Sequence, residues 1–133
     1  MTRPSPAIDL GPIDASCALV MCDLQQPDYP IVYASDAFTE LTGYTPSETV
    51  GRNCRFLQAP GGNVRKYSTR KYVDKETIKK MRWAVESNKE IAVEVTNFKR
   101  NGQKFVNLLS MIPVCWDSSL PRYSVGFQAE KTW

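Results

Sequence analysis

The stretch GRNCRFLQ, residues 51–58, places one cysteine on a short turn near the middle of the chain. Gly51 ends a preceding helical turn, and the residues after it are predicted to begin another short helical segment. Cys54 lies in this segment between Asn53 and Arg55, so its thiol is mounted rigidly. An isolated cysteine is more often a buried, inert side chain, so the rest of the sequence must decide its role.

Upstream, CALVMCDL (17–24) is predicted to be a strand that is apolar on both faces. A strand of this kind must be covered on both sides. Residues 1–16 are predicted to form an irregular arm because of their prolines and Gly11. This arm, or a partner molecule, is expected to cover the outer face, which carries Cys17, Leu19 and Met21.

Between this strand and the cysteine, PIVYA (30–34) predicts a second strand. Ser35 or Asp36 then caps a short helix that ends at Gly43. TPSE (45–48) follows the pattern of a helix start, with threonine as the cap, proline at the first helical position and glutamate closing a capping box.

Downstream, residues 59–73 form a long polar insertion, after which Asp74 is expected to cap a helix that runs to about Asn88. Three strands close the chain, and the order of elements predicts an α+β fold, with helices on one face of an antiparallel sheet. The three strands are predicted at residues 90–99, 103–114 and 122–130.

Two asparagines, Asn97 and Asn107, lie on otherwise apolar strand faces, where an unpaired buried amide costs about 1–3 kcal/mol. A two-residue turn would place them on opposite faces of the hairpin. A three-residue loop, residues 100–102, would pair Asn97 with residue 105 and point both amides the same way. Gly102 suits the left-handed third position of the longer loop, which we favour.

The last strand places Ser124, Gly126 and Gln128 on one face. Because serine and glycine occupy little volume, this face leaves room for a planar ligand. Glycine in a strand also often marks a close ligand approach. Gly126 could equally relieve a bulge while Gln128 faces solvent. The three amides Asn97, Asn107 and Gln128 could together recognise the edge of a heterocycle such as a flavin pyrimidine ring.

Composition excludes several functions. The chain has no histidine, which removes histidine-based nucleophilic, acid/base and haem-ligand chemistry. Its four cysteines form no C-x-x-C pair, so a metal site is not expected, and they are expected to be free thiols in a reducing compartment. No apolar run approaches the roughly 18 residues of a membrane span, and the start does not resemble a secretion signal.

Positive charge is concentrated in one segment. Residues 65–82 contain eight basic and two acidic residues, whereas the remaining chain has nine basic and twelve acidic residues. A nucleic-acid binder would usually be basic over a wider surface, so direct nucleic-acid binding is not expected.

The motif GRNCRFLQ resembles the signature of LOV domains, the flavin-binding branch of the PAS fold. PIVYASDAFTELTGY (30–44), NFKRNGQKFVNLLSMIPV (97–114) and YSVGFQ (123–128) resemble other parts of the same family. The insertion and the N-terminal segment resemble the small fungal photoreceptors of the Vivid and Envoy type. The resemblance implies a five-stranded antiparallel sheet with helices packed on one face around a flavin, as a LOV domain at 17–130 with an N-terminal cap at 1–16.

The resemblance also implies the chemistry. Blue light would drive a reversible bond between Cys54 and the flavin C4a carbon, with FAD as the expected chromophore and FMN as the alternative. Arg55, Arg70 and Arg82 would bind phosphate. The remaining cofactor contacts would come from Asn53 and Gln58 on the ribityl and pyrimidine sides, from the three amides Asn97, Asn107 and Gln128, and from the apolar walls Val20, Val32, Leu57 and Leu109.

Gln128 is expected to pass the signal to the arm near Cys17, exposing the apolar outer face. The protein would then form a homodimer in light or bind a related PAS protein, without a metal or a membrane, inside the cytoplasm or the nucleus. It is expected to be a sensor and not an enzyme. The alternatives are a flavin-dependent oxidoreductase and a ligand-sensing PAS module in which Cys54 has no photochemical role.

Overall fold

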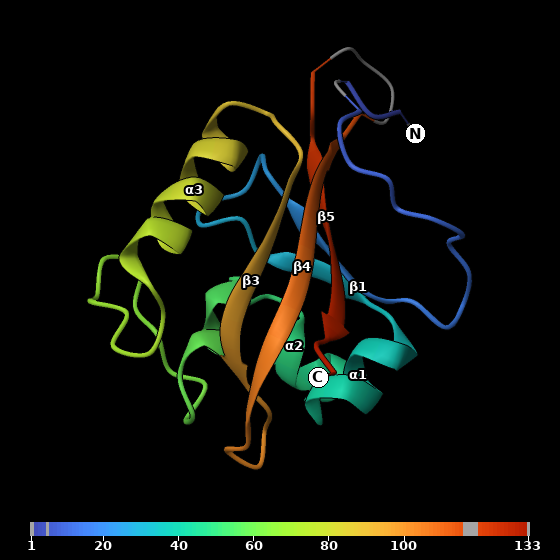
Figure 1. Cartoon of the computed structure of the whole chain (residues 1–133). Helices are drawn as coiled ribbons and strands as arrows, with labels where there is room; N and C mark the ends of the chain where they lie inside the picture. The colour runs from blue at the N-terminus through green and yellow to red at the C-terminus, as the bar shows by residue number, and fades with distance from the viewer. Residues whose placement is uncertain (1, 5, 116–119, 133) are drawn as a thin grey trace.

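The computed structural model describes residues 2–4, 6–115 and 120–132, and in this part of the chain five strands form one antiparallel sheet (Figure 1). The strand order β2-β1-β5-β4-β3 places the two N-terminal strands at one edge and the β3–β4 hairpin at the other. The predicted α+β architecture is confirmed. The strands are β1 (Ala18–Asp23), β2 (Ile31–Ala34), β3 (Ile91–Phe98), β4 (Lys104–Val114) and β5 (Tyr123–Glu130).

The helices begin and end where their capping residues predict. Ser35, and not Asp36, caps α1 (Asp36–Thr42), and Gly43 ends it in the left-handed conformation at φ 79°. Thr45 and Glu48 form the predicted capping box of α2 (Pro46–Thr49). A 3₁₀ helix, η1 (Cys54–Gln58), carries the central cysteine, and α3 (Lys75–Glu86) starts at the predicted Asp74 cap.

The inner face of the sheet supports two apolar clusters. Phe38 of α1 and Phe56 of η1 are buried in the first cluster with residues of β1 and β2. Ile78 and Met81 of α3 pack against the second cluster, which contains Val95 and Leu109. The apolar stripe on α3 therefore packs against the inner face of β3 and β4, as its spacing predicts.

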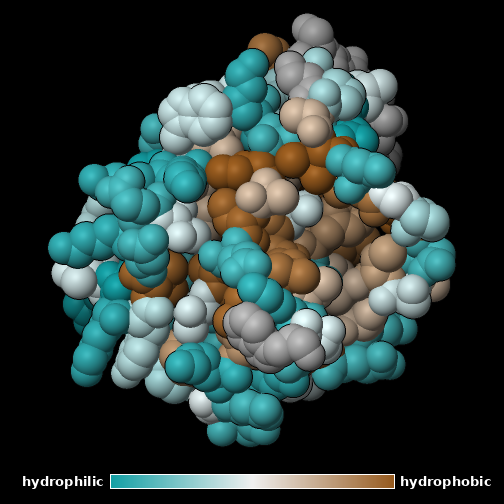
Figure 2. All heavy atoms as spheres, viewed as in Figure 1, coloured by the Kyte–Doolittle hydropathy of each residue, from teal (hydrophilic) through white to brown (hydrophobic). Residues whose placement is uncertain are grey.

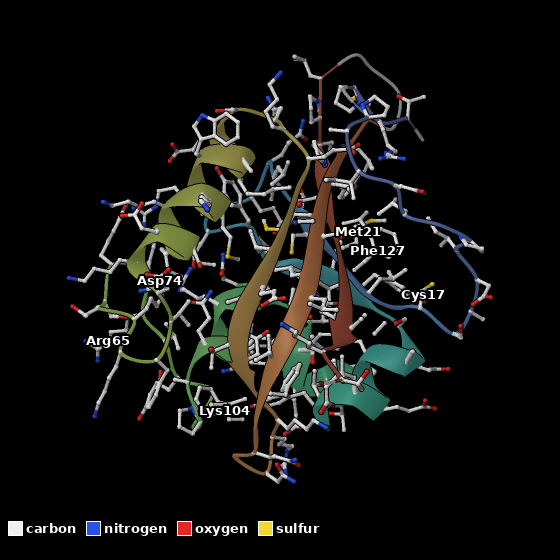
Figure 3. All side chains as sticks on the ribbon, in the orientation of Figure 1. Cys17, Met21, Arg65, Asp74, Lys104 and Phe127 are labelled. Atoms are coloured by element: carbon white, nitrogen blue, oxygen red, sulfur yellow. The ribbon has the colours of Figure 1, made fainter. Side chains whose placement is uncertain are left out.

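The N-terminal arm covers part of the outer face. Ile8 and Leu10 pack against a cluster that includes Leu19, Met21 and Phe127. Cys17, Met21 and Phe127 lie on the side of the sheet that faces the arm (Figure 3). The expectation that the arm covers the outer side of the first strand is confirmed.

A partly buried ion pair fixes the arm to the sheet. Glu90, which precedes β3, accepts hydrogen bonds from Arg3 Nε at 2.7 Å and from the backbone N–H groups of Ala7 at 2.8 Å and Ile8 at 2.9 Å. The Glu90 side chain is fully buried. Its pKa falls to about 2, chiefly because of the bond to Arg3, with further lowering by the two backbone groups.

Candidate functional site

Cys54 is the first residue of η1 and is half-buried. Asn53 caps this helix, because its Oδ1 accepts a hydrogen bond from Arg55 N at 2.9 Å. The Asn53 amide nitrogen also donates to the carbonyl of Asp28 at 2.7 Å. These bonds hold the turn on both sides of Cys54, while its side chain packs against the inner cluster. The predicted rigid mount is present.

Three of the four residues predicted as apolar walls are buried. Val20, Leu57 and Leu109 are buried at 2%, 3% and 7% exposure. Val32 is 39% exposed, so its assignment as a wall is wrong. Successive side chains of a strand point to opposite faces, and the inward position of β2 belongs to Ile31, which is 0% exposed.

The β3–β4 hairpin has the three-residue loop. Asn97 pairs with Phe105, and Lys99 N donates to Gln103 O at 2.9 Å, which leaves residues 100–102 as the loop. Both asparagines therefore point to one face, where Asn107 Nδ2 donates to Asn97 Oδ1 at 2.9 Å. At 3% and 1% exposure they form a buried amide pair.

Gln128 joins the last strand to the first. It pairs with Ala18 across the β1–β5 ladder, as its predicted position beside the first strand requires. Its side-chain amide lies 3.0 Å from Ala18 O and 3.1 Å from Gly126 O, and these two acceptors assign the amide nitrogen to that position. Gln128 is 8% exposed and does not face solvent.

Gly126 lies between two of the wall residues. A Cβ at this position would lie 3.5 Å from side-chain atoms of both Leu109 and Val20, and 3.3 Å from the Gln128 amide. A side chain here would therefore fill the space between the walls and the amide. The absence of a side chain fits a cradle for a flat ring, which favours the ligand interpretation of Gly126.

Arginines gather at the other end of the site. Arg55 forms a two-bonded ion pair with Asp28, and its Nε donates to Val64 O in the insertion at 3.0 Å. Arg70 Nε donates to Gln58 Oε1 at 3.0 Å. Burial lowers the pKa of Arg70, and the positive charges of Arg55 and Arg82 lower it further. Arg70 thus lies close enough to both other predicted phosphate ligands to be repelled by them, which an anion would relieve.

Three residues of the site were missed by sequence reasoning. Ile31 was passed over for its neighbour Val32. Asp28, the partner of Arg55, lies in the turn between β1 and β2, and nothing in its local pattern marks it. Cys22 belongs to the inner cluster against which Cys54 packs, and nothing in the pattern of the first strand marks it as a residue of the site.

These residues fit a flavin. The buried amide pair and Gln128 offer donors and acceptors for a heterocycle, Gly126 places no side chain between the walls and the Gln128 amide, and the neighbouring guanidinium groups suit phosphate. In the described part of the chain, no helix has both the length and the apolar character needed to cross a bilayer. None of the four cysteines, all of which the structure describes, is in a disulfide.

Comparison with protein families and curated proteins places these features in a known group. The model of the PAS domain family matches residues 16–128. The blue light receptor lreA of Aspergillus flavus is 48% identical over 130 residues, which are 98% of this chain and 15% of that protein. The White collar 1 protein of Neurospora crassa is 44% identical over 97% of this chain and 11% of its own length. The chain thus spans about a seventh or less of the length of these two relatives.

Solved structures match over nearly the whole chain. A structure of the photo-excited blue-light photoreceptor Vivid is 60% identical, with a TM-score of 0.92, and the match covers 96% of this chain and 87% of that one. The light-state dimer of the fungal photoreceptor Vivid matches at 58% identity and a TM-score of 0.91, over 96% and 86% of the two chains.

Proposed function

This chain belongs to the PAS domain family, among the fungal LOV photoreceptors of the Vivid type, and on that premise we propose that it senses blue light through Cys54 and a bound flavin. The observation that carries the proposal is the placement of the Cys54 thiol against the same inner cluster that contains the walls Val20 and Leu57. In this proposal the ring would bind between that thiol, the amides and Gly126.

When bound, a flavin supplies blue-light absorption and an electrophilic carbon, C4a. Cys54 would supply both the sulfur and the proton for a reversible bond to that carbon, so the reaction would consume no oxidant or reductant. Cys54 needs no histidine for this reaction, because light provides the reactivity that a base would otherwise supply. The rest of the site would bind and orient the flavin: the amides Asn97, Asn107 and Gln128 would hold the ring edge, and Asn53 and Gln58 would contact the ribityl chain and the pyrimidine side.

We further propose that FAD is the natural chromophore. Arg55, Arg70 and Arg82 would bind its phosphates, and the insertion at 59–73, which Arg55 and Arg70 tie to η1, would accommodate the adenosine. FMN would use the same arginines without the insertion.

Gln128 is proposed as the relay. The proton released by Cys54 changes the hydrogen bonding offered to this amide, which then rotates away from Ala18 O. Ala18 directly follows Cys17, the point at which the arm joins β1. Losing one such bond is worth about 1 kcal/mol, and up to 3 if a buried group is left unpaired. That amounts to roughly a five- to 150-fold shift of a balanced equilibrium.

We propose that illumination changes which proteins this chain binds. Moving the arm would expose Leu19, Met21 and Phe127, an apolar surface that a second copy of the chain, or a related PAS protein, could cover. We propose that this sensor, which performs no catalytic turnover, acts in the cytoplasm or the nucleus, where free thiols persist.

The photochemistry is tested by absorption spectroscopy. Purified protein is expected to be yellow, to lose its blue absorption on illumination and to recover in the dark. Cys54→Ala should keep the flavin and lose this bleaching, whereas Cys115→Ala, a change at a buried cysteine outside the site, should bleach normally. Normal reversible bleaching in Cys54→Ala, or a wild-type protein that cannot be loaded with flavin, would overturn the proposal.

A further inference from the structure

Ser68 carries an exposed hydroxyl in the insertion, and the proposed photochemistry does not use it. Its backbone N–H and its Oγ both donate to Arg65 O, at 3.1 Å and 2.7 Å, so residues 65–68 form one turn. Tyr67, the preceding residue, is 87% exposed. Among the described residues, the hydrogen bonds of Ser68 run only to Arg65 and Arg70, so the turn can open without breaking a bond to the sheet.

Basic residues surround this hydroxyl in the sequence. Between Glu48 and Asp74 the chain has six basic residues and no acidic one. Arg65 lies three residues before Ser68, and Figure 3 shows it at the outer edge of the molecule, away from the sheet. An arginine at this spacing is a charge pattern that basophilic protein kinases recognise in their substrates. The turn therefore offers such a kinase both an acceptor hydroxyl and a recognition residue.

Arg70 approaches the same hydroxyl from the other side. Its Nη1 donates to Ser68 Oγ at 3.2 Å and also to Ser68 O, and its Nη2 donates to Lys66 O at 3.0 Å. Its Nε donates to Gln58 Oε1 at 3.0 Å, so one guanidinium joins the exposed turn to η1. A group added to Ser68 Oγ would therefore meet the residue that we propose as a ligand of the flavin phosphate.

We propose that Ser68 is a phosphorylation site, and that a phosphate on it binds Arg70 and lowers the affinity of the protein for phosphorylated flavins. A protein kinase transfers the terminal phosphoryl group of a nucleoside triphosphate. The bond between Ser68 Oγ and that phosphorus forms, the bond from the phosphorus to the bridging oxygen breaks, and the nucleoside diphosphate leaves. The hydroxyl proton passes to the catalytic base of the kinase. The inference rests on the proposed function, because it takes Arg70 as a ligand of the flavin phosphate.

Charge and geometry give the direction of the effect. A phosphoserine carries a charge of about −1.5 to −2 at pH 7 and three acceptor oxygens. Since Arg70 Nη1 already lies beside Ser68 Oγ, these oxygens are within its reach, and charge-assisted bonds to them are stronger than its present bonds to backbone carbonyls. The phosphoserine therefore competes for the guanidinium, and FMN and FAD should bind about tenfold more weakly. Riboflavin, which has no phosphate, should be unaffected.

Phosphorylation of the purified protein tests the site. The protein is incubated with ATP and a basophilic kinase that selects arginine three residues before serine, and the phosphate is located by mass spectrometry. Ser68 should be modified, and Ser68→Ala should take up no phosphate there. Arg65→Gln should slow the reaction about tenfold or more, whereas Lys71→Gln, which removes the same charge from the same segment, should not. An unmodified Ser68, or equal rates in Arg65→Gln and the wild type, would overturn the assignment.

Flavin titration tests the consequence. The phosphorylated protein should lose affinity for FMN and FAD and keep its affinity for riboflavin. In Arg70→Gln the phosphate has lost its partner, so phosphorylation should change FMN affinity by no more than about twofold. Equal FMN affinity before and after phosphorylation, or an equal loss for riboflavin, would overturn the inference and leave the proposed function intact. If the unmodified protein binds none of the three flavins, the proposed function itself fails.

Discussion

Gly126 illustrates how one missing side chain can shape a binding site. Its neighbours Leu109 and Val20 are both well buried and have little room to move. Adding a methyl group to a packed site typically costs about 1–3 kcal/mol. We expect Gly126→Ala to weaken flavin binding about tenfold while the protein still folds, measured by flavin titration and thermal unfolding.

Gly61 gives the matched control for this prediction. An added Cβ at Gly61 meets no atom within 4 Å, and no positive φ restricts the position. Gly61→Ala should therefore bind FMN, which lacks the adenosine assigned to the insertion, as the wild type does. Equal affinity in the Gly126 and Gly61 variants would show that the space beside Gly126 does not hold the ring.

The proposed phosphate role of Arg70 rests on its position close to Arg55 and Arg82. We expect Arg70→Gln to weaken FMN and FAD about tenfold or more, because a charge-assisted bond to phosphate is lost. Riboflavin, which has no phosphate, should bind equally well to both proteins. Lys79→Gln, on the exposed side of α3, should change none of the three affinities. A loss of riboflavin affinity in Arg70→Gln would mean that the residue supports the site in some other way.

At the scale of elements, the bond between the arm and the sheet depends on Glu90. Glu90→Gln keeps the shape of the side chain but removes its charge, and hydrogen bonds to charged groups contribute about 1.5–3 kcal/mol. We expect the variant to lose about 2 kcal/mol of unfolding free energy at pH 7, measured in urea. Glu94→Gln, a change in an ion pair whose glutamate is 55% exposed, should cost much less.

The stability that the charged Glu90 side chain contributes should fall as the solution becomes acidic. The pKa of Glu90 is about 2 in the folded protein against an ordinary value of 4.5, so its stabilisation is complete above about pH 4.5. It is lost as the pH falls toward 2. The stability difference between wild type and Glu90→Gln should accordingly shrink on acidification, and a constant difference from pH 7 to pH 3 would contradict the assigned role.

Elements with local signals could be predicted from the sequence. Gly102 indicated the three-residue loop and hence the shared face of Asn97 and Asn107, and the caps at Thr45 and Asp74 located their helices. Contacts between distant segments could not be predicted. The local sequence indicates only that Glu90 begins a strand, and its partner Arg3 is 87 residues away. The choice between Ile31 and Val32 failed because β2 is too short for its apolar pattern to define a face.

At the scale of the molecule, the two ends of the proposed signal lie on opposite faces of one sheet. Cys54 packs on the inner face, whereas an open groove of about 770 Å³ runs beside the arm and the outer face, lined in part by Leu10, Cys17 and Phe127. Figure 2 shows apolar side chains exposed in the hollow on this side of the molecule. Ala18 and Gln128 border the groove as well, so the proposed relay ends at a surface with room for movement.

Amide hydrogen exchange of the flavin-loaded protein, in the dark and under blue light, tests the whole route from Cys54 to the arm. Illumination should increase exchange in residues 9–17 of the wild type and leave Ala7 and Ile8, whose N–H groups are held by Glu90, less affected. Cys54→Ala should show no light effect, and Gln128→Leu should bleach without the change in the arm. A Gln128→Leu protein whose arm responds to light as strongly as the wild type would contradict the account.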